Sequence, residues 1–297
     1  MVVLSAATVA LTVVLMGLAA YLPFYLSPAH RRATAYRAGI AYWSGWHWIW
    51  TNILQMPLAE VRFPPSWDPS VQRIYCSHPH GVGSFHHAGA MMCPPVCEPG
   101  KSFERVSPGA SRRELAATVL FRIPVIREIA LAMGCCDASR SVVGHVLARG
   151  LSVGLMAGGE QEQLLSMRGE HMVYVQRRKG IVKLALRHGV PLVPCYCFGE
   201  TDLYHQSRFA LRFRQWLCST LGVAITLAYG RTPLLPFLPI PGRLVHVIGT
   251  PIAVEKTTDP TAADVEALHA KYVAGLKAVF DEHKGTAGYA NATLIVV

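Results

Sequence analysis

The sequence predicts an α/β fold in which a mainly parallel sheet is flanked by helices, with a membrane anchor at the N-terminus. Short apolar runs alternate with helical patterns from residue 73 onward, and such alternation is typical of a parallel sheet with helical crossovers. Hydrophobic residues make up 52% of the 297 residues and charged residues only 15%, whereas charged residues are about a quarter of an ordinary soluble domain. Association with a membrane accounts for that imbalance.

The N-terminal segment is long and apolar enough to cross a bilayer. No charged side chain occurs from Met1 through Ala29, and residues 2–26 are almost wholly apolar; roughly 20 such residues span the hydrocarbon layer as a helix. Pro23 leaves a re-entrant hairpin as an alternative to one spanning helix. A secretory signal peptide would need a positively charged start and a shorter apolar stretch, so we expect a retained anchor.

The residues that follow the anchor indicate its orientation and its surroundings. Arg31, Arg32 and Arg37 come next, and the positive-inside tendency then predicts that the bulk of the chain faces the cytosol. Residues 42–50 hold four of the six tryptophans. This segment is typical of an interfacial helix or a shallow insertion, with a buried aromatic helix as the alternative.

Charge and cysteine content narrow the classes of partner. The formal net charge of +10 fits an anionic membrane face or a polyphosphorylated ligand. The basic residues are dispersed and match no zinc-finger, homeodomain or basic-zipper pattern, so no nucleic-acid partner is expected. The eight cysteines show no paired C-x-x-C spacing, and we expect them to pack as small buried hydrophobes rather than to bind zinc or form disulfides.

The predicted elements follow one another along the rest of the chain. Strands are expected over 73–77, 151–157, 171–176 and 191–198, with β-rich stretches over 223–229 and 244–248. Helices are expected over 112–133 with an interruption at Pro124, over 180–188, and over 261–284, where Thr261 and Asp264 approximate a capping box. Ligands of such sheets bind beyond the carboxyl ends of the strands, so residues that follow these strands are expected to share one crevice.

The tetrad His78-Pro79-His80-Gly81 directly follows the first predicted strand. An imidazole, with an unperturbed pKa of roughly 6.5, takes and returns a proton near neutral pH. Proline fixes its own φ, and glycine allows the chain to turn sharply out of the strand or to approach a ligand closely. The tetrad therefore suits a catalytic base at the mouth of a sheet; a turn with two solvated histidines is the alternative.

Three further segments carry charged groups at the ends of predicted elements. Glu160 and Glu162 follow a strand, and a carboxylate near an imidazole can fix its tautomer; a solvated acidic loop is the alternative. The basic run 177–183 leads into a helix, which suits a phosphate, unless it is a charged loop with a solvated helix face. Residues 198–200 end a strand in a turn with an acid, a weak signal alone.

Taken together and in this order, these segments resemble the type 2 diacylglycerol O-acyltransferases and their monoacylglycerol and wax-alcohol relatives. The resemblance covers nearly the whole chain, and its longest block runs from Arg178 to Glu200. The other matching stretches are 75–81, 121–128, 229–231, 247–252 and 280–284.

The resemblance implies an enzyme of the endoplasmic-reticulum membrane, or of lipid droplets, with a cytosolic catalytic domain. It would transfer a fatty acyl group from the co-substrate acyl-CoA to the hydroxyl of diacylglycerol, without a cofactor or metal. Monoacylglycerol or a long-chain alcohol is the alternative acceptor, and a homo-oligomer is an open expectation. We predict a membrane anchor and interfacial helix over 1–57 and an acyltransferase catalytic domain over 58–297.

Acyl transfer from a thioester to a hydroxyl needs a base for the hydroxyl proton and a donor for the developing oxyanion. With the resemblance, we expect His80 to be that base, with His78 as the other candidate, and Glu162 to orient the histidine or the acceptor hydroxyl. Arg178, Lys179 and Lys183 are expected to meet the CoA phosphates. The remaining predicted substrate-binding residues are Gly81, Gly180, Phe198, Gly199 and Glu200.

The chain also departs from its wider relatives, and other readings stay open. Related glycerolipid acyltransferases place an aspartate five positions after the catalytic histidine, where this chain has Phe85 after His80 and Gly83 after His78. Glu162 is therefore our candidate for the acid. A metal-dependent hydrolase that uses His78, His80, His86 and His87 as ligands is one alternative. A non-catalytic lipid-binding member is another, and Cys76 as a nucleophile is a third.

Overall fold

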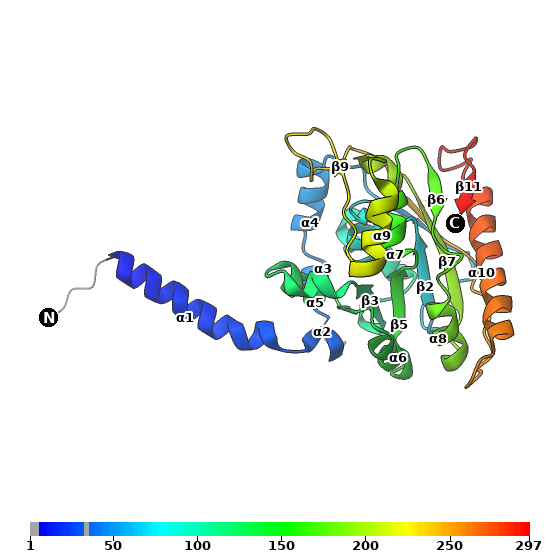
Figure 1. The fold of residues 1–297 in the computed structure, drawn as a ribbon, viewed down its shortest axis with the longest axis horizontal. Helices are drawn as coiled ribbons and strands as arrows, with labels where there is room; N and C mark the ends of the chain where they lie inside the picture. The colour runs from blue at the N-terminus through cyan, green and yellow to red at the C-terminus, as the bar shows by residue number, and fades with distance from the viewer. Residues whose placement is uncertain (1–5, 33–35) are drawn as a thin grey trace.

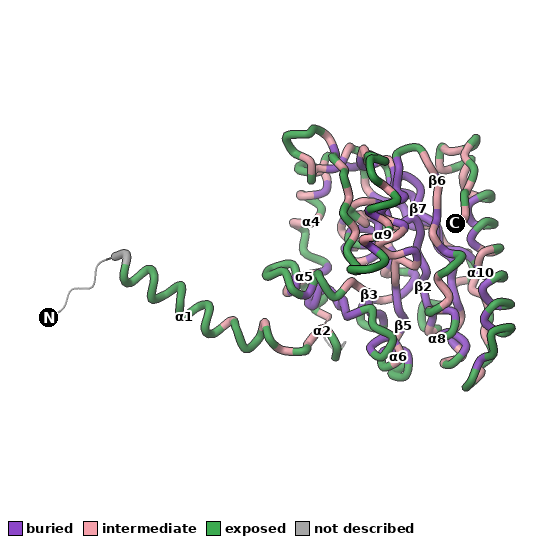
Figure 2. The backbone as a smooth tube through the Cα atoms, viewed as in Figure 1, coloured by how far each residue is buried: buried purple, intermediate pink, exposed green. Residues whose placement is uncertain are grey.

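The computed structural model describes residues 6–32 and 36–297, so residues 1–5 and 33–35 of the predicted membrane region lie outside the described part. Helix α1 (Ala6–Leu26) projects away from the body, and its described side chains are almost all exposed (Figures 1 and 2). Within the described residues, the stretch Thr8–Arg32 is long and apolar enough to cross a membrane, with a mean hydropathy of 2.0. Pro23 lies inside α1, which runs on as one helix rather than as a re-entrant hairpin.

The body is built on a seven-stranded sheet with the order β1-β10-β7-β2-β5-β3-β4. Only the β10–β7 pair is antiparallel among these strands, so the predicted mainly parallel sheet is confirmed. Two small sheets pair β6 with β11 and β8 with β9. The strand bounds are β1 Glu60–Arg62, β2 Ile74–His78, β3 Arg112–Ala116, β4 Cys135–Asp137, β5 Ser152–Met156, β6 His171–Val173, β7 Leu192–Phe198, β8 His205–Gln206, β9 Ala228–Tyr229, β10 Val245–Ile248 and β11 Leu294–Val296.

Helices cover the sheet and connect its strands (Figure 1). The α-helices after α1 are α2 Ala29–Arg32, α3 Ala38–Ala41, α4 Gly45–Trp48, α5 Ile126–Ala132, α6 Arg140–Ala148, α7 Gly159–Leu165, α8 Gly180–His188, α9 Leu211–Leu221 and α10 Ala262–His283. The π- and 3₁₀-turns are η1 Ile49–Ile53, η2 His86–Met91, η3 Pro94–Val96, η4 Phe103–Arg105, η5 Gly109–Ser111, η6 Thr118–Arg122 and η7 Glu200–Leu203.

Strand β2 occupies the centre of the sheet between β7 and β5, and all five of its residues are buried. Successive side chains of a strand point to opposite faces. Ile74 and Cys76 therefore join the core beneath α8 and α10, whereas Tyr75 packs into the second core on the other face. Because His78 shares its face with Ile74 and Cys76, the strand directs its ring toward α10.

The periodic elements predicted from the sequence are largely confirmed. Strands β2, β5, β7 and β10 and helices α8 and α10 lie where they were expected, and Thr261 and Asp264 form the predicted capping box. In 171–176 and 223–229 only the short strands β6 and β9 form.

The predicted helix over 112–133 is wrong in its first part, where residues 112–116 form β3 and only α5 is α-helical. Strand β3 pairs with both β5 and β4, so sheet hydrogen bonds override local helical preference. Arg112 and Glu114, two positions apart on one face of the strand, are both buried and form an ion pair.

The tryptophan-rich segment is divided between core and surface. Trp50 is 4% exposed within the core, whereas Trp43 and Trp48 are 53% and 57% exposed. Met56 is also buried in the core of the body. Residues 38–57 thus pack against the body, and the interfacial role of the exposed tryptophans stays a prediction.

Candidate active site

The tetrad leaves the sheet at the carboxyl end of its central strand. His78 is the last residue of β2, and residues 79–85 form the loop that leads into η2. Gly81 adopts φ of 68°, and a side chain there would collide with the carboxylate of Glu200. The glycine is required because the loop turns through the left-handed region against a buried acid.

His78 is fully buried, and both of its ring nitrogens have partners. Its Nδ1 lies 2.8 Å from Oε2 of Glu162 on α7, and its Nε2 lies 2.8 Å from the hydroxyl of Tyr272 on α10. Since a carboxylate only accepts, Nδ1 donates to Glu162 and Nε2 accepts from Tyr272. The ring is therefore held between two helices and has no nitrogen free for a substrate.

Glu162 holds the main chain of the loop at His80 rather than the ring of His80. Besides His78, it accepts the main-chain N–H groups of His80 and Tyr174, each at 2.7 Å. Glu162 follows strand β5 as expected, and the alternative of a solvated acidic loop is wrong, because the residue lies on α7 and is fully buried. The predicted contact between this carboxylate and a histidine ring exists, and that ring belongs to His78.

His80 differs from His78 in having one ring nitrogen engaged and one open. Its Nδ1 lies 2.9 Å from the carbonyl oxygen of Gly81 and 3.0 Å from Oγ of Ser84. Because a carbonyl can only accept, Nδ1 carries the proton and Nε2 keeps its lone pair. In the described part of the chain Nε2 has no hydrogen-bond partner, and the half-buried ring lines a large cavity.

The cavity has a volume of about 1080 Å³ and is mostly apolar. Its walls come from η1, η2, η6, α5, β5 and the start of α8. Representative apolar lining residues are Trp50, Met92, Leu115, Leu120, Ile129 and Leu155. Arg177 and Arg178 line one part of it, and a smaller polar pocket of about 320 Å³ shares these two arginines. The cavity thus combines a mostly apolar lining with two arginines, beside which Glu160 also lines both pockets.

The residues predicted to meet phosphates separate into two groups. Arg178 and Gly180 line the cavity, whereas Lys179 forms an ion pair with Glu266 on α10. Lys183 is exposed on α8 and does not line the cavity. Arg177 and Arg140, which we had not selected, do line it. The sequence does not show which side chains of an irregular loop and a short helix face a cavity, which is why Lys179 and Lys183 were selected and Arg177 was not.

The remaining predicted binding residues form the floor beneath the loop rather than the cavity wall. Phe198 is fully buried in an aromatic cluster with Tyr196 and Phe280. Gly199 adopts φ of 91°, where a side chain would strike the carbonyl oxygen of Arg243. These residues shape the end of β7 on which Glu200 is presented.

Glu200 caps the turn that follows the tetrad. It accepts the main-chain N–H groups of Phe85 and His86 at 2.9 and 2.8 Å and Nδ1 of His86 at 3.0 Å. Burial raises the pKa of the Glu200 carboxyl to about 7, although the two main-chain N–H donors oppose the shift. The acid is thus committed to holding the start of η2.

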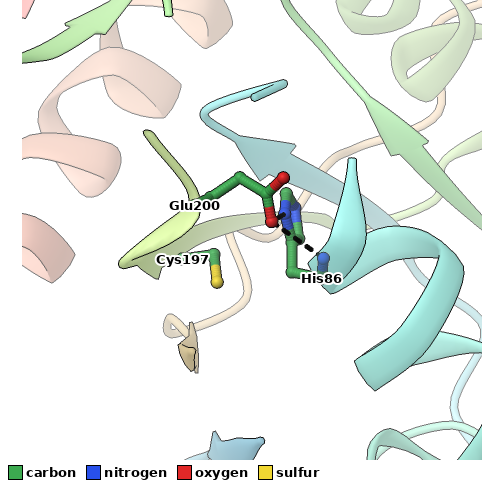
Figure 3. Close-up of side chains that lie close together, drawn as sticks. All are labelled: His86, Cys197 and Glu200. Carbon is green, nitrogen blue, oxygen red and sulfur yellow. Dashed lines mark hydrogen bonds and ion pairs between the residues drawn. The ribbon is translucent and has the colours of Figure 1, made fainter. Parts of the chain in front are cut away.

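His86, Cys197 and Glu200 place potential ligand atoms within 4.8 Å of one another (Figure 3). Three N–H donors already occupy the Glu200 carboxylate, and the Cys197 thiol points to the carbonyl oxygen of Phe198. Burial raises the pKa of that thiol well above its usual value, so it retains its proton. These three residues are therefore better suited to holding the start of η2 than to binding a metal ion.

The four histidines considered as zinc ligands, His78, His80, His86 and His87, do not point toward one common site. His78 turns to Glu162, His86 to Glu200 and His87 to Glu114. His87 also lines the cavity, but its second nitrogen is buried. Each ring is paired with a different carboxylate, which leaves His80 as the tetrad histidine with an accessible lone pair.

Cys76, the alternative nucleophile, is fully buried on the α10 face of the sheet, and burial raises the pKa of its thiol to about 12. Thiolate is the nucleophilic form. Cys76 is therefore neither accessible to a substrate nor ionised, and it does not suit the role of nucleophile.

Tyr272 and Ser84 were missed by sequence reasoning. Ser84 lies four residues after His80, so its hydroxyl could have been considered for a turn contact. Tyr272 lies 194 residues from His78 along the chain, and nothing in the local sequence signals the contact.

The chain is similar to known proteins over most of its length. The chain matches the family model described as Diacylglycerol acyltransferase over residues 5–297. It is 33% identical over 263 residues to diacylglycerol O-acyltransferase 1 of Eremothecium gossypii, with 84% of this chain and 56% of that relative covered. It is 33% identical over 262 residues to 2-acylglycerol O-acyltransferase 3 of Homo sapiens, with 83% of this chain and 74% of that relative covered.

The aligned part of the chain thus spans little more than half the length of the Eremothecium gossypii relative. A solved structure of the 1-acyl-sn-glycerophosphate (LPA) acyltransferase PlsC from Thermotoga maritima aligns over 79% of each chain, with 15% identity and a TM-score of 0.42. The family model, which matches nearly the whole chain, confirms the resemblance read from the motifs. The chain belongs to the diacylglycerol acyltransferase family.

Proposed function

We propose that this protein is a membrane-anchored, acyl-CoA-dependent O-acyltransferase that acylates the free hydroxyl of diacylglycerol to give triacylglycerol. Membership of the family supports the reaction class. The single observation that carries the mechanism is the ring of His80, whose Nδ1 is held by Gly81 and whose Nε2 is open to an apolar cavity.

In the proposed reaction Nε2 of His80 takes the hydroxyl proton while the oxygen attacks the thioester carbonyl carbon. The C–O bond forms, the C–S bond breaks, and the CoA sulfur receives the proton from the imidazolium. Such base catalysis contributes roughly 10²–10⁴-fold to the rate. The carbonyl of Gly81 and the hydroxyl of Ser84 fix the ring in place of the carboxylate that we expected from Glu162.

For the acyl donor, we propose that Arg177 and Arg178 bind CoA phosphates together with the N-terminus of α8 at Gly180. Guanidinium groups bind phosphate oxygens by paired charge-assisted hydrogen bonds, and helix N-termini favour anions. Lys179 and Lys183 are less suited, since one is paired with Glu266 and the other lies outside the cavity lining. The fatty chains would occupy the apolar part.

Diacylglycerol is proposed as acceptor because the matching family model and one of the two relatives carry it in their names. The name of the other gives a 2-acylglycerol instead, and monoacylglycerol and long-chain alcohols are the second candidates. An endoplasmic-reticulum location with a cytosolic body is part of the proposal, based on the apolar α1 and the arginines that follow it.

The test is acyl transfer from radiolabelled acyl-CoA by the full chain in proteoliposomes, against monoacylglycerol, diacylglycerol, fatty alcohols and sterols. We expect labelled triacylglycerol as the dominant product. A labelled product from monoacylglycerol or an alcohol alone would replace the acceptor and keep the reaction. No labelled product from any acceptor would favour a non-catalytic lipid-binding protein.

A further inference from the structure

A proline-rich hairpin over residues 231–243 carries the most exposed large apolar side chains of the described residues. Leu234 is 92% exposed and Phe237 is 88% exposed. No charged residue occurs from Thr232 through Gly242. Exposed apolar residues of this size, gathered on one short loop, mark an interaction surface rather than a solvated turn.

Several main-chain polar groups of this hairpin have partners inside the protein. Four of its residues are prolines and lack an N–H group. The N–H group of Leu235 donates to the carbonyl of Thr232, and that of Leu238 donates to the carbonyl of Leu235. The N–H group of Ile240 donates to the carbonyl of Leu203. The carbonyls of Pro236 and Leu238 accept the main-chain N–H groups of Gly230 and Arg231, respectively. The carbonyl of Phe237 accepts the hydroxyl of Tyr204. Because lipid supplies no hydrogen bonds, these internal partners lower the free-energy cost of moving the hairpin into a bilayer.

The hairpin lies beside other apolar elements of the body. Arg231 donates to the carbonyl of Leu54, 2.6 Å away, which ties the hairpin to the residues that follow the tryptophan-rich segment. In Figure 1 the golden loop lies next to α4, on the side of the body toward which α1 projects. Val119, Leu120 and Ile126 line the cavity and are also 37–48% exposed, so they mark its mouth.

We propose that the 231–243 hairpin inserts into the phospholipid bilayer as a second membrane contact beside α1. With two points of attachment, the body cannot swing about α1. The exposed face with Trp48 and the cavity mouth is then held against lipid, and a neutral lipid can pass between bilayer and cavity. This inference concerns attachment and is independent of the chemistry proposed for His80.

The experiment uses the full chain in phosphatidylcholine liposomes and an environment-sensitive NBD label on an engineered cysteine. All eight native cysteines are buried, so a surface thiol can be labelled selectively, with the unsubstituted chain as the check. Leu234→Cys places the label on the hairpin, and Lys277→Cys places it on the exposed face of α10, away from the hairpin. Both proteins are measured in liposomes with and without brominated acyl chains.

We expect the label at position 234 to emit at shorter wavelength in liposomes and to be quenched by the brominated chains, while the label at 277 shows neither change. Equal behaviour at the two positions would overturn the proposal. A blue shift without bromolipid quenching would also overturn it, because the hairpin would then contact protein, such as a second copy of the chain.

Discussion

The two histidines of the tetrad lie two residues apart and have opposite surroundings. His78 is sealed between Glu162 and Tyr272, while His80 keeps one nitrogen open to the cavity. Strand alternation sends His78 to the same face as Ile74 and Cys76, where α10 packs. The chain has left the strand by His80, so its ring is free to turn toward the cavity.

This difference predicts separate outcomes for the two alanine variants. His78→Ala removes the partner of a buried carboxylate and of a buried hydroxyl, so we expect a loss of about 3 kcal/mol in the free energy of unfolding. His80→Ala should change stability much less, because its ring is half-buried and only its Nδ1 is bonded. Thermal unfolding of both variants in detergent checks this, and equal destabilisation would count against the assignment.

Glu200 gives a prediction on pH. Burial raises the pKa of its carboxyl from 4.5 to about 7, so the folded state binds more protons than the unfolded state between these values. The free energy of unfolding therefore falls as pH rises through this window. In Glu200→Gln this contribution is absent, and the stability of the wild type relative to the variant should fall by on the order of 3 kcal/mol from pH 4.5 to 7. Melting temperatures across this range test it; a constant difference would contradict it.

At the scale of elements, α7 and α10 meet at the end of β2 through one imidazole. Glu162 comes from α7, Tyr272 from α10 and His78 from the strand. Glu162 also holds the main-chain N–H of His80. Movement of either helix would thus be transmitted to the loop that carries the proposed base.

Tyr272 is therefore a positioning residue. Tyr272→Phe removes one buried hydrogen bond, and we expect a stability loss of about 1 kcal/mol. Because His80 is held through this network, kcat should fall while KM for acyl-CoA stays unchanged. Steady-state kinetics beside melting curves test the prediction. A variant that loses stability while kcat stays unchanged would reduce Tyr272 to a structural residue.

Helices and strands were predicted correctly where the apolar residues of a segment follow a single helical or strand pattern. The amphipathic pattern of 180–188 and the capped start of 261–284 fixed α8 and α10, and the apolar run 191–198 fixed β7. The prediction of a helix at residues 112–116 was wrong because the partner strand β5 is distant in sequence. In addition, two charged side chains are buried there as an ion pair. The acidic segment 158–162 does follow strand β5, as expected, but the sequence did not show that helix α7 begins at its second glycine and buries Glu162.

At the scale of the whole molecule, the site combines residues whose contacts no local pattern reveals. The tetrad and Glu162 could be selected from sequence, because both follow strands that a parallel sheet brings together. Which carboxylate meets which ring depends on the packing of α7 over β2. The separation of Arg178 from Lys183 depends on where the cavity opens beside α8.

The cavity predicts unequal effects of removing two nearby positive charges. Arg178→Gln should raise KM for acyl-CoA by about tenfold or more, since a charge-assisted hydrogen bond contributes roughly 1.5–3 kcal/mol. Lys183→Gln, the matched control on the exposed side of α8, should leave KM unchanged. Initial-rate kinetics against acyl-CoA concentration decide between them. Equal increases would indicate a diffuse electrostatic effect instead of a phosphate contact.

The central claim is that Nε2 of His80 is the base for acyl transfer. The most direct test is the turnover of radiolabelled acyl-CoA and diacylglycerol by the His80→Ala protein in proteoliposomes, with its melting temperature measured in parallel. We predict a rate at least about 10²-fold below that of the wild type, with the melting temperature close to the wild-type value. A folded His80→Ala protein that turns over at the wild-type rate would contradict the claim.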